Sequence, residues 1–212
     1  MRGHPHDDGD LSKNSDYVLP NIFIVSNEGH AIECRDYVAE LNIYEDIYKN
    51  AVTGTLVMLD PVNLISKIPL QGTERVMFQL GTPGTKGSSN LTVDATETTG
   101  HPFHIYKLSA RQQQKDGVES YILHFCSREM FRNIRTRESR AYNGNLDISA
   151  YKIFANKSAL DGRKKFKYEP TRNQDKIVMP NVRPFDAINM LASRALSKNG
   201  KRAGYLFYET TK

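Results

Sequence analysis

A series of five arginines lies within ESYILHFCSREMFRNIRTRESRAYNG, Glu119 to Gly144. The stretch opens as an alternating strand, and at Ser127 the spacing changes to that of an amphipathic helix. Most of the arginines are three or four residues apart, so that some share one helix face. They are Arg128, Arg132, Arg135, Arg137 and Arg140. Such a face suits nucleic acid, an acidic protein partner or solvent.

The other ionisable residues do not predict catalysis. His101 and His104 flank Pro-Phe at the start of a strand and His124 lies inside a strand, which favours structural roles for all three. Glu45 and Asp46 are adjacent on an extended segment, where neighbouring side chains point to opposite faces and cannot form an acid/base pair. We therefore predict that the chain is not an enzyme and has no catalytic residues.

Cofactor and metal sites are not predicted either. Cys34 and Cys126 each lie in an apparent strand, which favours small buried hydrophobic residues over a disulfide or a nucleophile. The Gly-rich stretch GTPGTKGSSN (81–90) fails as a phosphate-binding loop, because Lys86 occupies the position of the required glycine. The N-terminal arm holds four weak candidates for metal ligands: His4, His6, Asp7 and Asp8.

Composition is that of a globular protein: 212 residues, 39% hydrophobic, 25% charged, and a net charge of +5. No apolar run approaches the roughly 20 residues of a membrane span, and the N-terminus lacks the apolar segment of a signal peptide. We expect an unsecreted, soluble protein with no membrane partner. The basic excess lies in the arginine run and in RKKFK, Arg163 to Lys167, and it fits nucleic acid, an anionic surface or an acidic protein.

The elements that position these residues divide into an N-terminal arm, a β-rich part and a mixed part. Residues 1–20 have no periodicity and predict a flexible or partner-ordered arm. Residues 21–126 alternate with period two and predict strands, including one long bent strand over 31–47 and a hairpin at Asp116-Gly117. We expect an antiparallel β-barrel or sandwich there.

Residues 127–212 predict an α+β domain. Ser127 caps the arginine helix, which Asn143-Gly144 ends. Asp147 caps a second helix, with its apolar side formed by Ile148, Tyr151, Phe154 and Ala155. The third helix begins at Pro184, carries Phe185, Ile188, Leu191, Ala192 and Ala195 on one side, and closes at Gly200. GYLFYE (204–209) predicts a final strand.

The order of these segments resembles a known family. YVAELNIYEDIYKNAVTGTLVMLD, IPLQGTERVMFQL, HPFHIYKLSARQQQKDGVESYILHFCSREM, VMPNVRPFDAINMLASRAL and GYLFYET follow one another as in the N-terminal part of the baseplate central hub protein of T-even-type contractile-tail bacteriophages, particularly marine phages and cyanophages. The resemblance spans about residues 20–212. It rests on strands and helices in a fixed order, without a short catalytic signature.

The resemblance implies a structural role. The hub protein is a homotrimer that joins the central spike to the tail tube, and two tube-like domains per chain give a pseudo-sixfold ring, which makes it a symmetry adaptor. Residues 21–126 correspond to the first tube-like domain and 127–212 to the helical insertion domain. The implied partners are tail spike, tail tube and tape-measure proteins, with DNA only as the genome passing through the lumen. The implied location is the virion tail baseplate, assembled in the bacterial cytoplasm.

Family members continue into a second tube-like domain, so we expect either that 212 residues are a fragment or that this phage divides its hub differently. Because an open sheet edge can pair with another chain, we predict a subunit interface on edge strands. Its residues are Tyr37, Leu41, Ile43, Thr53, Thr55 and Val57. We further predict a partner-facing basic helix, carrying Arg128, Arg132 and Arg135.

Two other functions stay open. The alternative is a nucleic-acid-binding protein that uses the Arg128–Arg140 helix and the Arg163–Lys167 run, and it would bind DNA in a salt-dependent manner. A hydrolase ranks third, because it would require a paired acid and base that the sequence does not offer.

Overall fold

The computed structural model describes residue 19 and residues 21–67, 71–82, 91–98, 100–113, 117–199 and 204–211. Apart from Leu19, which packs against the first core, the N-terminal arm with its four candidate metal ligands lies outside the described residues, as does most of the 81–90 loop. So does Asp116 of the predicted hairpin turn. No helix of the described part is long and apolar enough to cross a membrane.

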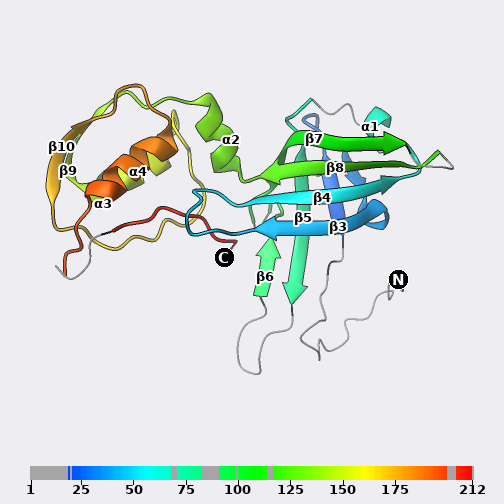
Figure 1. Ribbon diagram of the computed structural model, residues 1–212, viewed down its shortest axis with the longest axis horizontal. Helices are drawn as coiled ribbons and strands as arrows, with labels where there is room; N and C mark the ends of the chain where they lie inside the picture. Colours follow the sequence, from blue (N-terminus) through cyan, green and yellow to red (C-terminus); the bar gives the residue numbers. More distant parts are fainter. Residues whose placement is uncertain are drawn as a thin grey trace.

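An antiparallel sheet forms the first part of the described chain (Figure 1). Its strands are β1 (Ile22–Val25), β2 (Ala31–Glu33), β3 (Val38–Tyr44), β4 (Thr53–Asp60), β5 (Arg75–Thr82), β6 (Leu91–Asp94), β7 (Phe103–Gln113) and β8 (Glu119–Cys126). Seven of them follow the order β2-β1-β5-β7-β8-β4-β3, and β6 pairs with β5 off this path. The alternating patterns that predicted these strands reflect one buried face, most clearly in β4 and β8.

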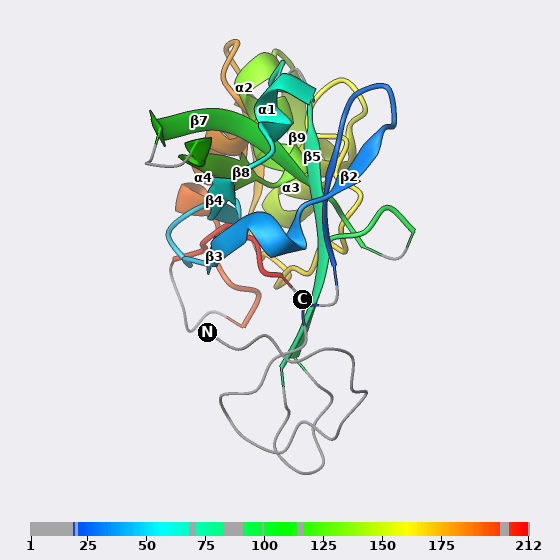
Figure 2. The same cartoon turned by 90° about the vertical axis from the view of Figure 1, so that its right-hand side faces the viewer.

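The sheet is curled but not closed into a barrel (Figure 2). β2 and β3 stand at opposite ends of the strand order, yet only residues 34–37 separate them in the sequence. The two ends of the sheet must therefore approach each other. The 3₁₀ turn η1 (Arg35–Tyr37) occupies the gap, and no ladder joins β2 to β3 in the described residues. The prediction of one long strand over 31–47 was wrong, because this 3₁₀ turn interrupts it.

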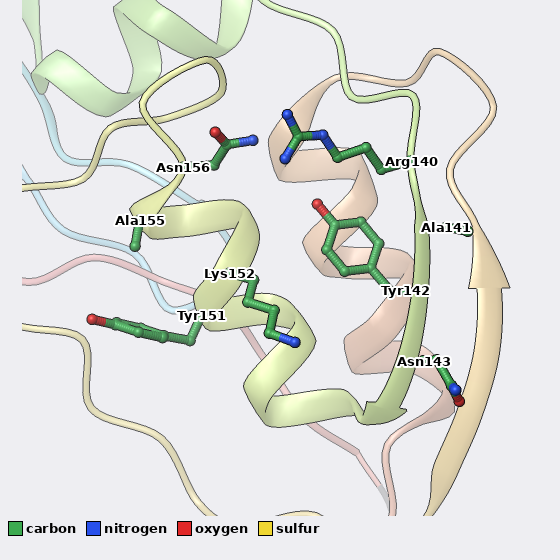
Figure 3. Close-up of a pocket in the computed structure, with 8 residues that line it drawn as sticks. All are labelled: Arg140, Ala141, Tyr142, Asn143, Tyr151, Lys152, Ala155 and Asn156. Carbon is green, nitrogen blue, oxygen red and sulfur yellow. The ribbon is translucent and has the colours of Figure 1, made fainter.

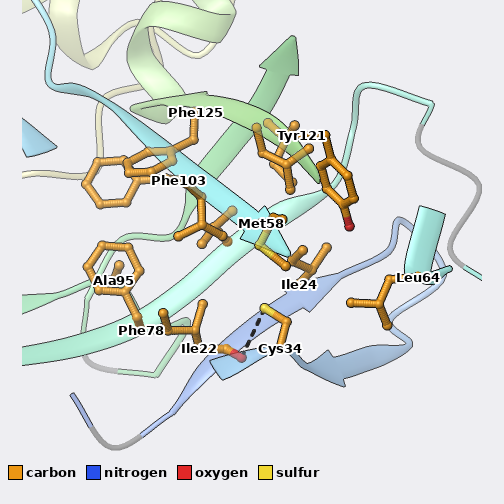
Figure 4. Packing of buried hydrophobic residues seen from close by; sticks show 14 of the residues in the cluster. Ile22, Ile24, Cys34, Met58, Leu64, Phe78, Ala95, Phe103, Tyr121 and Phe125 are labelled. Atoms are coloured by element: carbon orange, nitrogen blue, oxygen red, sulfur yellow. Dashed lines mark hydrogen bonds between the residues drawn. The ribbon is translucent and has the colours of Figure 1, made fainter. Parts of the chain in front are cut away.

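A hydrophobic core fills the inside of the curled sheet (Figure 4). Phe103 packs against Phe78 and Phe125, with ring centroids 5.8 and 5.0 Å apart. Gly54 of β4 lies under Phe125, because a Cβ at this position would come within 2.2 Å of that ring. The free thiol of Cys34 is also buried here and donates to the carbonyl of Ile22 at 3.4 Å.

A buried carboxylate closes one end of this core. Asp60 is 0% exposed and accepts hydrogen bonds from the backbone N–H groups of Val62 and Leu64 and from the Tyr121 hydroxyl, at 3.0, 2.6 and 3.1 Å. It thereby links the end of β4 to β8 and to the short helix α1 (Leu64–Lys67).

The second part is α+β, as predicted. It contains α2 (Arg128–Arg135), β9 (Ala141–Asn145), α3 (Leu146–Ala155), β10 (Gln174–Val178) and α4 (Pro184–Arg194). β9 and β10 form a separate antiparallel pair whose buried Tyr142 and Ile177 are ladder partners (Figure 1). With α3 and α4 they enclose a second core, to which Ala51 of the β3–β4 connection also belongs. The domain boundary after residue 126 stays a prediction.

Three helix predictions needed correction. α2 ends at Arg135 rather than near Asn143, because the chain turns extended at Thr136, whose hydroxyl donates to the Arg132 carbonyl at 2.9 Å. α4 ends at Arg194, before Gly200. On α3 the N-cap is Asn145, and the predicted cap Asp147 lies in the first turn. Of the predicted apolar side only Phe154 is buried, because Ile148, Tyr151 and Ala155 are exposed. The buried residues of the helix are Leu146, Asp147, Ser149, Ile153 and Phe154.

The predicted strand at 204–209 is an extended segment without a ladder in the described residues. Side-chain contacts hold it: Asn50 donates to the Phe207 carbonyl at 2.7 Å, and Glu209 accepts from the N–H of Val52 at 2.9 Å. The N–H of Thr211 also donates to the carboxylate of Glu45, just after β3. The segment therefore ties the second part to the β3–β4 connection.

Candidate interaction surface

Arg128 and Arg132 lie on the side of α2 that faces the turn after α3. Arg128 donates to the carbonyl and to the carboxylate of Asp161, at 2.7 and 2.6 Å. Arg132 donates to the carbonyls of Ala159 and Lys157, at 3.0 and 2.6 Å. The hydrogen bond from Arg128 is the main cause that lowers the pKa of the Asp161 carboxyl. These two cations hold the turn against α2.

Arg135 remains on the surface. Its guanidinium carbon stands 4.5 Å from the centroid of the Phe131 ring, and the residue is exposed. The assignment of this helix to a partner stays a prediction, and among its three arginines the exposed Arg135 is the one suited to test it. Charge reversal at Arg128 or Arg132 would also break contacts inside the chain.

The second basic run is joined to the C-terminal segment. Lys164 forms an ion pair with Glu209 and lies 5.8 Å from the centroid of the Phe103 ring. The side chains of Lys164 and Glu209 are 20% and 10% exposed. This lysine therefore contributes to the contact between the two parts of the chain, which the sequence pattern did not indicate.

The six predicted interface residues fall into two groups. β3 is a terminal strand of the sheet, as an edge interface requires, whereas β4 lies between β3 and β8 and is not an edge. Tyr37 lies in the 3₁₀ turn before β3, and it packs against the core together with Leu41 and Ile43 of β3. The other three, Thr53, Thr55 and Val57, alternate with buried residues on β4 and so lie on the outer face of the sheet. The interface itself stays a prediction.

The outer face near the β3 edge mixes polar and apolar groups. Tyr44 is 49% exposed, and its hydroxyl is 3.4 Å from the hydroxyl of Thr55. The Asn42 amide donates to the same hydroxyl at 3.4 Å. Leu59 at the other end of β4 is 42% exposed. This face offers hydrogen-bonding and apolar surface beside an open strand edge.

The histidines and cysteines do not converge on a reaction centre within the described residues. His104 stacks on Phe131 at 5.3 Å, and burial lowers its pKa to about 4, so the ring is neutral at pH 7. The His124 Nε2 atom lies 2.7 Å from the Ser109 hydroxyl, and both residues are partly exposed. Cys34 and Cys126 are free and buried, as predicted, and burial raises the pKa of each thiol to about 12.

A cavity of about 870 Å³ between the two parts escaped sequence reasoning. Its wall includes Glu129, Lys164, Phe166, Phe207 and Glu209. Glu129 is 4% exposed, and both of its carboxylate oxygens lack a hydrogen-bond partner in the described part of the chain. The residue lies in the first turn of α2, where a helix N-terminus stabilises negative charge.

A second hollow, of about 470 Å³, lies between β9 and α3 (Figure 3). Its wall contains two cations, Arg140 and Lys152, and no acidic residue; the other members are Ala141, Tyr142, Asn143, Tyr151, Ala155 and Asn156. In Figure 3 the Arg140 guanidinium points toward Asn156 and the Lys152 side chain extends from α3 toward β9. We call this hollow the β9 groove.

No family model matches the sequence, and no curated protein matches it. Comparison with solved structures finds a tail protein from Neisseria meningitidis, with a TM-score of 0.49 and 14% identity over 87% of this chain and 48% of that one. A tail protein of prophage MuSo2 from Shewanella oneidensis gives 0.49 and 9%, over 82% and 47%. A type VI secretion component from E. coli, described as similar to T4 bacteriophage tail proteins, gives 0.39 and 11%, over 74% and 42%. The chain thus spans about half the length of the first two.

Proposed function

We propose that this chain is a structural component of a phage tail baseplate hub, where it joins the central spike to the tail tube as a symmetry adaptor. It acts as a homotrimer, without catalysis. The order of its strands and helices resembles the hub family, and that resemblance is the source of the proposal. The solved structures named above are tail and secretion-system proteins, but at TM-scores below 0.5 the proposal does not rest on them.

The open edge of β3 is the observation that carries the proposal. The curled antiparallel sheet ends there, beside a half-exposed outer face with Tyr44 and Thr55. A ring of subunits needs a surface of this kind on each copy, because an edge strand or a sheet face of one chain can be continued by the next. In this proposal Thr53, Thr55 and Val57 face the neighbouring copy together with the edge of β3.

Nucleic-acid binding is the less favoured alternative. It required a helix from Arg128 to Arg140, but α2 ends at Arg135, and two of its arginines are bound to the turn after α3. The Arg163–Lys167 run is also partly engaged, through Lys164 and Glu209.

A substitution at the β3 edge tests the proposal. Asn42→Lys with Tyr44→Lys places like charges on the same edge of every copy, which opposes pairing between copies. We expect the trimer to dissociate in analytical ultracentrifugation while the circular dichroism spectrum stays unchanged. The matched control is Gln71→Lys with Thr98→Lys, which adds the same charge at exposed positions away from this edge. If the edge variant assembles as the control does, β3 is not the interface.

A further inference from the structure

The β9 groove runs along a strand edge rather than across a sheet face. Four consecutive residues of the chain, Arg140 to Asn143, line it. Because successive side chains of a strand point to opposite faces, consecutive residues can border one hollow only along the strand's edge. No residue of β10 lines the groove, so the edge concerned is the one opposite the β9–β10 ladder.

The backbone of β9 presents unpaired groups to this groove. Met179 donates to the Arg140 carbonyl at 2.8 Å, and the ladder continues with Tyr142 opposite Ile177. In an antiparallel pair the hydrogen-bonded positions alternate, so residues 140, 142 and 144 direct their backbone groups toward β10. Ala141 and Asn143 then direct their N–H and C=O groups toward the groove. Among the described residues β9 forms a ladder with β10 alone, so no neighbouring strand pairs with these groups.

The charges of the groove select the partner. Arg140 is 60% exposed at its side chain, and its Nε lies 3.7 Å from the Glu138 carboxylate, beyond hydrogen-bonding distance. The Glu138 side chain is 3% exposed and accepts a hydrogen bond from the Tyr142 hydroxyl at 2.9 Å. This buried carboxylate offsets part of the Arg140 charge. Lys152 is exposed on α3, and no acid lines the groove. Both cations are therefore open to an anionic ligand.

From this juxtaposition we propose that the β9 groove binds an extended, acidic segment of a partner protein as a third strand beside β9. The backbone of that segment bonds to Ala141 and Asn143, and carboxylates at alternate positions pair with Arg140 and Lys152. The surface lies in the second part of the chain and is separate from the β3 edge, so it gives the protein a contact that the trimer does not use.

An eight-residue peptide of alternating Thr and Glu, labelled with fluorescein, tests this by fluorescence anisotropy on the full chain. We expect binding that weakens with salt, and no binding of the matching Thr-Lys peptide. Arg140→Glu with Lys152→Glu should weaken binding of the Thr-Glu peptide by about tenfold or more, since each exposed ion pair contributes up to about fivefold and the reversed charges repel the peptide. Lys49→Glu with Lys67→Glu has the same charge change at exposed sites outside the groove, and should bind within about twofold of wild type.

Asn143→Pro separates strand addition from simple charge attraction. Proline removes the N–H that points to the groove but no hydrogen bond of the β9–β10 ladder, so the fold should persist by circular dichroism. We expect this variant to lose binding by about tenfold, and Asn143→Ala to bind as wild type. Wild-type affinity of Asn143→Pro would overturn the strand geometry. Failure of the Thr-Glu peptide to bind at about 1 mM, or preferential binding of short single-stranded DNA that depends on Arg140 and Lys152, would overturn the acidic partner.

Discussion

Arg128 and Arg132 of α2 hold the turn after α3, and the loss of stability on their removal should be measurable in the isolated chain. Arg128 and Arg132 together donate four hydrogen bonds to the turn after α3, three of them to main-chain carbonyls. A hydrogen bond from a charged donor contributes about 1.5–3 kcal/mol when buried, and about 1 kcal/mol after a discount for partial exposure. Because the two residues hold the same turn, their contributions overlap.

We therefore expect Arg128→Ala with Arg132→Ala to lower the free energy of unfolding by about 3 kcal/mol. For a chain of this length, that corresponds to a fall of about 6–12 °C in Tm. Urea and thermal unfolding followed by circular dichroism give both quantities. The sequence alone would have assigned these arginines to solvent or to a partner, with little effect on stability.

A second double variant provides the control. Arg135→Ala with Arg137→Ala removes two exposed cations of the same region, whose recorded contacts are a ring and a single carbonyl at 3.3 Å. The free energy of unfolding of this control variant should fall by less than about 1 kcal/mol. Equal stability of the two double variants would refute the structural role of Arg128 and Arg132, and would return all the arginines to the partner-facing hypothesis.

Three further variants test the first part of the chain, two in its core and one where β7 meets α2. Gly54→Ala should destabilise the chain by about 3 kcal/mol in urea unfolding, because the new Cβ would meet the Phe125 ring and a backbone carbonyl at 2.2 and 2.4 Å; a loss below about 1 kcal/mol would mean that the core yields there. Asp60→Ala should cost about 3 kcal/mol or more, since three donors lose their acceptor, and a two-state melt near the wild-type Tm would contradict this. His104 has a folded pKa of about 4, below its unfolded value of about 6.5, so the folded state favours the neutral ring. Its contribution is fully present above pH 6.5 and is lost as the pH falls toward 4. His104→Phe should reduce the fall in the free energy of unfolding between pH 6.5 and pH 4. An unchanged pH dependence would mean that other groups cause it.

Alternation along the strands was sufficient to predict most of the sheet. β4 and β8 bury every second residue over most of their lengths, so their patterns survive in the sequence. The break between β2 and β3 was not visible in the sequence, since Cys34, which precedes the 3₁₀ turn, and Tyr37, which ends it, suit a strand equally well. The C-terminal segment reads as a strand because alternate residues face the protein, although it has no ladder partner in the described residues.

The candidate surfaces were less predictable, because they depend on contacts between distant residues. Asp147 of α3 is buried, and its carboxylate accepts a hydrogen bond of 2.7 Å from the Thr171 hydroxyl. The two residues are 24 positions apart in the sequence. This pairing turns Ile148 outward and overrides the apolar pattern of the helix. Likewise, the acceptors of Arg128 and Arg132 are mainly carbonyls, which carry no sequence signal. The β9 groove could not be predicted, because it is formed by the packing of β9 against α3 rather than by a pattern within either element.

The molar mass of the purified chain in solution, measured by light scattering at low and high salt, tests the central claim most directly. A trimer of 24.1 kDa chains, about 72 kDa, that persists in high salt is the result expected for a subunit of a hub ring. A mass of 24.1 kDa at every protein concentration and at both salt concentrations would contradict it.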